Sequence, residues 1–98
     1  MRERDLQDTI RQAASLFGYR TYHTYDSRRS PCGFPDLVIV GHGQLIMWEL
    51  KNETGRLTEA QEGWIDDLRK VEGPPHVNIV RPADLDECLA LLKNKRHR

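Results

Sequence analysis

Three charged residues, Asp36, Glu49 and Lys51, stand in a pattern that could hydrolyse a phosphodiester bond. Asp36 follows Pro35 at the start of one apolar run, and Glu49 and Lys51 end another. Side chains alternate along a strand, so Glu49 and Lys51 are expected to point to the same face. Two carboxylates at one point suit a hard cation such as Mg²⁺ or Mn²⁺. A nearby lysine could hold an attacking water or offset charge on a phosphate oxygen.

Two strands joined by a tight turn are needed to bring these residues together. A turn centred on His42 and Gly43 separates the apolar runs and predicts a hairpin. The register then pairs Val40 with Leu45, Ile39 with Ile46, Val38 with Met47, Leu37 with Trp48, and Asp36 with Glu49. All pairs before the charged one are apolar on both strands, which supports this register. Like charges directly opposite each other destabilise a sheet, and a bound divalent cation would remove that repulsion.

The alternative is that Asp36, Glu49 and Lys51 are ordinary strand-end residues in surface salt bridges. Pro-Asp followed at a loose spacing by Glu-x-Lys arises from composition alone in roughly one chain in several tens. The prediction of a metal site therefore depends on the placement of these residues on paired strands. An ion held by the two carboxylates is expected to bind poorly below about pH 4, where both are protonated.

The other elements are predicted from apolar spacing and from capping residues. The sequence predicts, in order, a helix over 6–17, a strand over 19–25, strands over 36–40 and 45–51, a helix over 58–71, a strand over 77–80 and a helix over 82–92. Thr58 and Gln61 form a capping box at the start of the second helix. The order α-β-β-β-α-β-α indicates an α/β fold in which helices flank one mixed β-sheet.

Length and composition indicate a single soluble domain over residues 1–98. The chain is 31% charged and 38% apolar, and its longest apolar runs have four residues, too few to span a membrane. No signal peptide is visible, and Cys32 and Cys88 match no metal or disulfide pattern, so a cytoplasmic location is expected.

Charge balance bears on the partners that this chain could bind. Fifteen basic residues balance fifteen acidic ones, which argues against coating nucleic acid by bulk charge. Local phosphate binding remains compatible with this balance, because the charges are segregated. Arg28, Arg29 and Ser30 form a basic patch just before Asp36, where contact with DNA phosphates and a solvated loop are the two alternatives.

Several segments together resemble the VRR-NUC domain of the PD-(D/E)xK nuclease superfamily, which has the restriction-endonuclease-like fold. They are Gly33-Phe-Pro-Asp-Leu-Val-Ile-Val40, Trp48-Glu-Leu-Lys51, and Gly55-Arg-Leu-Thr58 with Gln61 and Trp64, within a resemblance that runs from Glu3 to about Leu92. The resemblance implies a Mg²⁺- or Mn²⁺-dependent DNA endonuclease. Asp36, Glu49 and the main-chain carbonyl of Leu50 would be metal ligands, and Lys51 the catalytic lysine. Stand-alone members are similar to Holliday junction resolvases, which implies a homodimer that cuts branched DNA.

Two further positions follow from the same resemblance. Family members often place an acidic residue on the first helix near the metal, and the candidates here are Glu3 and Gln7, one turn apart. Spacing to Gly18 favours Gln7, but only Glu3 supplies a carboxylate. Gln61 is a candidate catalytic-site residue and also a capping residue, and the two roles are compatible.

Other functions stay open at this level. One alternative is a nuclease that prefers flaps, nicked duplexes or single strands. Another is a DNA-binding module that keeps the fold without catalysis, although the presence of Asp36, Glu49 and Lys51 speaks against it.

Overall fold

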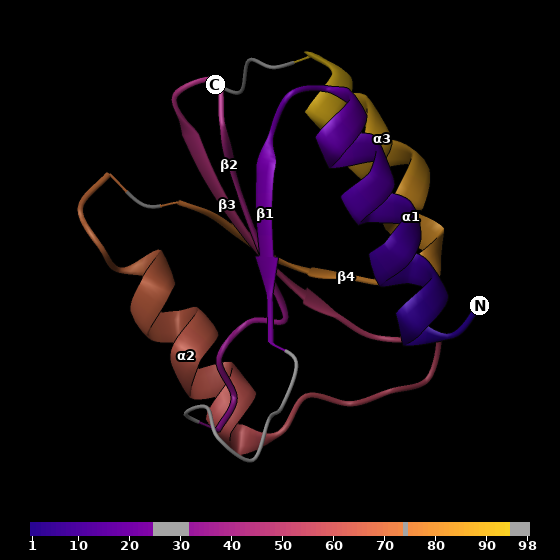
Figure 1. Cartoon of the computed structure of the whole chain (residues 1–98). Coiled ribbons are helices and arrows are strands. Elements are labelled where there is room, and N and C mark those ends of the chain that lie inside the picture. Colours follow the sequence, from indigo (N-terminus) through magenta and orange to yellow (C-terminus); the bar gives the residue numbers. More distant parts are fainter. Residues whose placement is uncertain (25–31, 74, 95–98) are drawn as a thin grey trace.

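One mixed four-stranded sheet separates two layers of helices. The structure is a computed structural model that describes residues 1–24, 32–73 and 75–94. Its elements are α1 (Glu3–Leu16), β1 (Arg20–His23), β2 (Leu37–Gly41), β3 (Gln44–Leu50), α2 (Glu59–Arg69), β4 (His76–Val80), the 3-10 turn η1 (Pro82–Asp84) and α3 (Leu85–Asn94). Helices α1 and α3 lie side by side on one face of the sheet and α2 lies on the other (Figure 1). The predicted α/β class and element order are confirmed.

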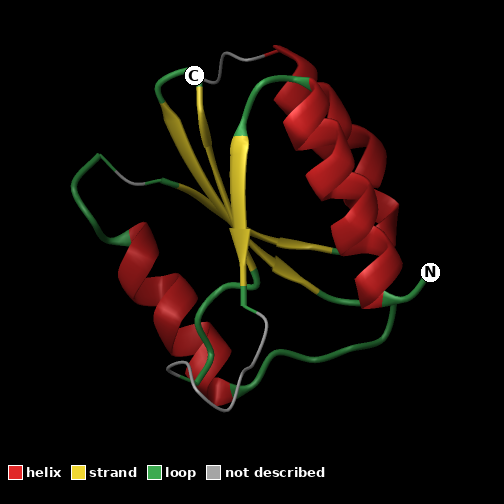
Figure 2. Cartoon of the chain, viewed as in Figure 1, coloured by secondary structure: helices red, strands yellow, loops and turns green. Residues whose placement is uncertain are grey.

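The sheet order is β1-β2-β3-β4, which makes β3 an interior strand. β1, β2 and β3 form an antiparallel meander, and β4 runs parallel to β3 on its other side (Figure 2). The hairpin register is confirmed from Val40 opposite Leu45 to Leu37 opposite Trp48. Asp36 lies just before β2, so the strand pairing itself ends one residue short of the predicted Asp36–Glu49 pair.

Alternation along β3 sends its side chains into two separate cores. Ile46, Trp48 and Leu50 belong to a core under α1 and α3, together with Leu6 and Ile10 of α1. Met47 belongs to a smaller core under α2. Because Glu49 is two residues after Met47, it points to the α2 face.

Most helices and strands end within a few residues of the predicted positions. Gly18 follows α1 with a φ of 88°, a left-handed conformation that favours glycine. The next residue, Tyr19, is buried, and its hydroxyl donates to the Leu92 carbonyl at 2.9 Å, which fixes α1 against α3. β1 is shorter than the strand predicted over 19–25, whose last residue lies outside the described part of the chain.

The start of the last helix differs from the prediction. Pro82–Asp84 forms a 3-10 turn, and the α-helix begins only at Leu85. The Asp84 N–H donates to the Arg81 carbonyl at 2.8 Å, which is the i to i+3 bond of a 3-10 turn, and the Asp84 carboxylate accepts the Arg81 N–H at 2.9 Å. Within the described residues, no helix is long and apolar enough to cross a membrane.

Candidate active site

Glu49 is a buried acid near the end of the interior strand β3. Its side chain is only 1% exposed, which contradicts the alternative that it is an ordinary strand-end residue in a surface salt bridge. Burial of an ionised carboxylate without partners costs several kcal/mol. One oxygen, Oε2, accepts from the Gln61 side-chain amide at 3.3 Å. The other, Oε1, is buried and has no hydrogen-bond partner among the described residues.

Asp36 lies next to Glu49 and is held by the main chain of β3. Its Oδ2 accepts the Leu50 N–H at 2.9 Å, so this carboxylate continues the β2–β3 ladder where the main-chain pairing stops. The structure therefore brings together the two predicted carboxylates, and it does so through the residue after Glu49.

The segment before Asp36 is fixed against α2. Gly33 has a φ of 90°, and a Cβ added there would lie 2.5 Å from the main-chain carbon of Ala60 in α2. Phe34 packs edge-to-face on Trp64, with ring centroids 5.0 Å apart. Trp64 Nε1 also donates to the Cys32 carbonyl at 3.1 Å. The sequence analysis named Trp64 only as part of the family resemblance, so this anchoring contact was missed.

The two carboxyl groups interact as a pair. Burial raises the pKa of Glu49 from 4.5 to about 9, and the neighbouring Asp36 carboxylate adds to this rise. When both groups are ionised, the repulsion predicted from the sequence remains.

Lys51 completes the group of three charged side chains. Its positive charge lowers the pKa of Glu49, which opposes the larger effects of burial and of Asp36. The Lys51 N–H donates to the Val80 carbonyl at 2.9 Å, so β4 fixes the main chain where β3 ends. Leu50 is buried and points to the opposite face, which leaves only its main chain for a site role.

Gln61 makes both of the contacts that were considered for it. Its side-chain oxygen Oε1 accepts the Thr58 N–H at 2.9 Å, and its main-chain N–H donates to Thr58 Oγ1 at 3.1 Å, which confirms the capping box. Its amide nitrogen donates to Glu49 Oε2. One side chain therefore joins the first turn of α2 to the buried carboxylate.

Among the described residues, the remaining predicted site residues form no hydrogen bond or ion pair with Asp36 or Glu49. Glu3 is exposed in the first turn of α1, and its charge raises the pKa of Glu49, so it acts on the site electrostatically. Gln7, one turn further along α1, is half-buried. Arg28, Arg29 and Ser30 lie outside the described residues, so their predicted contact with DNA stays a prediction.

The donor set of this site fits a divalent cation. Asp36 and Glu49 supply carboxylate oxygens, which Mg²⁺ and Mn²⁺ prefer, and Glu49 Oε1 is a buried oxygen with no donor among the described residues. Within 1–24, 32–73 and 75–94, no group of three or more His, Cys, Asp or Glu side chains could hold a metal. Glu3 therefore does not form a three-carboxylate cluster with the pair, and a cation here would depend on main-chain or water oxygens as well.

A separate cavity lies on the other face of the sheet. It has a volume of about 410 Å³ and lies between β4 and α3, where Trp48, His76, Asp84 and Glu87 are among the residues that line it. None of the predicted site residues lines it, because Glu49 points to the α2 face.

Comparison with known protein families supports the interpretation of this geometry. The family model of the VRR-NUC domain matches residues 3–82, which include all elements from α1 to β4. Neither the curated proteins nor the solved structures gave a match.

Proposed function

Because the chain belongs to the VRR-NUC domain family, we propose that it is a Mg²⁺- or Mn²⁺-dependent endodeoxyribonuclease that cuts branched DNA such as Holliday junctions. Family membership makes the chain a nuclease domain with DNA as its substrate. The observation that carries the metal-dependent part is the pairing of Asp36 with the buried Glu49, whose Oε1 has no donor among the described residues.

Asp36, Glu49 and the main-chain carbonyl of Leu50 would hold the metal. When bound, the ion supplies a water of lowered pKa and a positive charge that offsets the charge on the phosphate. Asp36 is oriented for this task by the Leu50 N–H, and Glu49 by the amide of Gln61. Both carboxylates are thus restricted before any ligand arrives, which reduces the cost of ordering them.

Lys51 would act on the reacting groups directly. Its ammonium can donate to the attacking water or to a phosphate oxygen, where negative charge grows as the bond is cut. Its effect on the pKa of Glu49 supports a place beside the carboxylates. The burial of Glu49 supports a strong influence of this charge, because charges interact more strongly away from water.

The preference for branched DNA rests on the resemblance to stand-alone junction resolvases. Two identical sites in a homodimer would suit a four-way junction, in which opposing strands need paired cuts. The chain is 11.4 kDa, so light scattering after size exclusion would separate a monomer from a dimer of twice that mass. A monomer at micromolar concentration would contradict the dimer.

A cleavage panel tests the proposed activity. We would incubate the protein with a four-way junction, a flap, a fork, a duplex and a single strand, in Mg²⁺ or Mn²⁺. The junction is expected to be cut at least about tenfold faster than duplex, which corresponds to about 1.4 kcal/mol of discrimination. Faster cutting of a flap or single strand would overturn the junction preference and leave the nuclease assignment intact.

Metal titration by calorimetry separates the nuclease from a DNA-binding module without catalysis. The proposed enzyme is expected to bind a divalent ion, and Asp36→Asn is expected to weaken that binding. If the protein cuts none of the five substrates and binds no divalent ion, the proposed activity is wrong.

A pair of variants at the start of α2 tests the contribution of Gln61. Thr58→Ala removes only the helix cap and is expected to lower the free energy of unfolding by about 1 kcal/mol. Gln61→Ala removes a similar capping contact and also the hydrogen bond to Glu49. It is expected to lose a similar amount of stability and to cut about tenfold more slowly. Urea unfolding and single-turnover cleavage measure the two effects, and equal cleavage by both variants would limit Gln61 to capping.

A further inference from the structure

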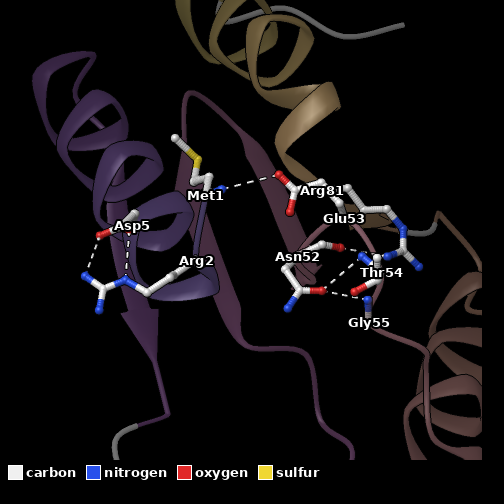
Figure 3. Close-up of polar contacts among 8 residues, drawn as sticks. All are labelled: Met1, Arg2, Asp5, Asn52, Glu53, Thr54, Gly55 and Arg81. Carbon is white, nitrogen blue, oxygen red and sulfur yellow. Dashed lines mark hydrogen bonds and ion pairs between the residues drawn. The ribbon is translucent and has the colours of Figure 1, made fainter.

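The main chain after Lys51 folds back over the side chain of Lys51. The Asn52 side-chain oxygen accepts the N–H groups of Thr54 at 3.1 Å and of Gly55 at 2.6 Å (Figure 3). A Cβ added at Gly55 would lie 3.3 Å from Lys51 Cδ, which is closer than an ordinary van der Waals contact. The turn over residues 52–55 therefore packs against the aliphatic part of Lys51.

Arg81 holds this turn in place from the end of β4. Its Nη1 donates to the Asn52 carbonyl at 2.9 Å, in a contact that joins residues 29 positions apart (Figure 3). Arg81 is itself fixed, because its N–H donates to the Asp84 carboxylate at 2.9 Å. The Lys51 N–H, in turn, donates to the carbonyl of Val80, the residue before Arg81. Val80 and Arg81, at the end of β4, thus bond to Lys51 and Asn52, which follow β3.

We propose that Arg81 is a positioning residue that sets the place of the Lys51 ammonium through the Asn52 carbonyl. The proposal rests on the proposed function, in which Lys51 acts on the reacting groups. A lysine side chain has many rotamers, and fixing its main chain and packing its stem removes much of that freedom before the reaction. A displacement of about 1 Å at a reacting group can cost about 10²-fold in rate.

The direction of the Arg81 side chain supports an indirect role. Its guanidinium donates to the main-chain carbonyl of Asn52. Arg81 therefore has a geometric route to the site through Lys51, and its removal should affect the orientation of the lysine rather than the charge of the carboxylates.

The first experiment compares Arg81→Ala with a matched control, Arg69→Ala, at the end of α2. Arg69 also donates its guanidinium to a β4 carbonyl, that of Val77, at 3.2 and 3.1 Å. Arg81→Ala is expected to lower kcat about 10-fold to 10²-fold with KM unchanged. Arg69→Ala is expected to lower Tm similarly and to leave kcat within about twofold of the wild-type value. A rise in KM without loss of kcat would mean that Arg81 binds DNA, and would overturn the proposal.

Rescue separates a positioning role from general destabilisation. Arg81→Lys keeps a charged donor and is expected to retain most of the kcat lost in Arg81→Ala. Guanidinium ion at low millimolar concentration is expected to restore part of the activity of Arg81→Ala. The proposal is overturned if Arg81→Lys is as slow as Arg81→Ala and guanidinium has no effect.

A double-mutant cycle with Lys51 tests whether Arg81 acts through the lysine. If it does, Arg81→Ala will cause no further loss of kcat in a Lys51→Ala background. Full additivity of the two effects would overturn the proposal. Wild-type cleavage by Lys51→Ala alone would instead remove Lys51 from the proposed mechanism, so the two failures are distinguishable.

Hydrogen exchange gives a result that does not depend on cleavage. Arg81→Ala is expected to speed amide exchange at Thr54 and Gly55 at least about tenfold, because it releases the turn that protects them. The same amides are expected to be unchanged in Arg69→Ala. Unchanged exchange in Arg81→Ala would show that Arg81 does not hold the turn, and would overturn the proposal even if the protein cut no DNA.

Discussion

Replacing Lys51 by alanine is expected to lower the rate of phosphodiester cleavage by about 10³-fold while the protein stays folded and still binds DNA. The loss follows from removing the only ammonium that acts on Glu49 among the described residues. Asp36→Asn is expected to cause a comparable loss, because an amide oxygen is a poorer ligand for a divalent ion than a carboxylate. Single-turnover cleavage of a labelled junction measures the rate, and a gel shift without metal measures DNA binding.

Two exposed residues of the same types provide matched controls. Lys70 and Asp66 lie on or just after α2 and away from the carboxylate pair. Lys70→Ala and Asp66→Asn are expected to cut at the wild-type rate with unchanged Tm. If Lys51→Ala or Asp36→Asn also cut at the wild-type rate, the assignment of the site would be wrong.

The metal-free protein is expected to become less stable as the pH rises from about 5 to about 9. The pKa of Glu49 in the folded state is about 9, against 4.5 for the ordinary carboxyl group. The folded protein therefore holds this proton more tightly than the unfolded chain does. The stability from this group is fully present below about pH 4.5 and is lost as the pH rises towards about 9. A fall in Tm of at least about 5 °C is expected, which for this size corresponds to about 1 kcal/mol.

Mn²⁺ is expected to oppose this loss of stability. The ion requires an ionised Glu49, so binding releases the proton that Glu49 holds and becomes more favourable as the pH rises. The increase in Tm on adding Mn²⁺ should therefore be larger at pH 8 than at pH 5. Glu49→Gln should remove both the pH dependence and the response to the ion. A wild-type Tm that rises with pH in the absence of metal would contradict the pKa assignment, and the sequence-based limit of about pH 4 for metal binding is too low if the assignment holds.

The hairpin and the helix cap could be predicted because both depend on local pattern. Apolar residues on both sides of the turn allow only one register that keeps them paired, and the structure has that register from Val40–Leu45 to Leu37–Trp48. Thr58 and Gln61 are three residues apart, and this spacing alone is enough to place a capping box. The register also predicted that Asp36 lies near Glu49. In the structure Asp36 reaches this place through its side chain, which accepts the Leu50 N–H, and not through main-chain pairing.

The burial of Glu49 could not be predicted, because it depends on strand order and on a distant helix. β4 is parallel to β3 and adjacent to it, which places β3 inside the sheet, and α2 then covers Glu49. The role of Arg81 was missed for a similar reason, since its contact with Asn52 joins residues 29 positions apart. A sequence shows the polarity of an acid but does not show which distant element will exclude water from it.

The interior position of β3 also decides how the site can fail. β4 pairs with β3 as far as Leu50, and on the other edge β2 pairs as far as Trp48 and the Asp36 side chain bonds to Leu50. Glu49 therefore lies in a segment that is held on both sides and is protected from fraying at sheet edges and chain ends. Its partner Gln61, by contrast, lies in the opening turn of a helix, where local melting is easier. Local unfolding would therefore first break the hydrogen bond from Gln61 to Glu49 and leave β3 intact. Activity would then be lost before the protein unfolds.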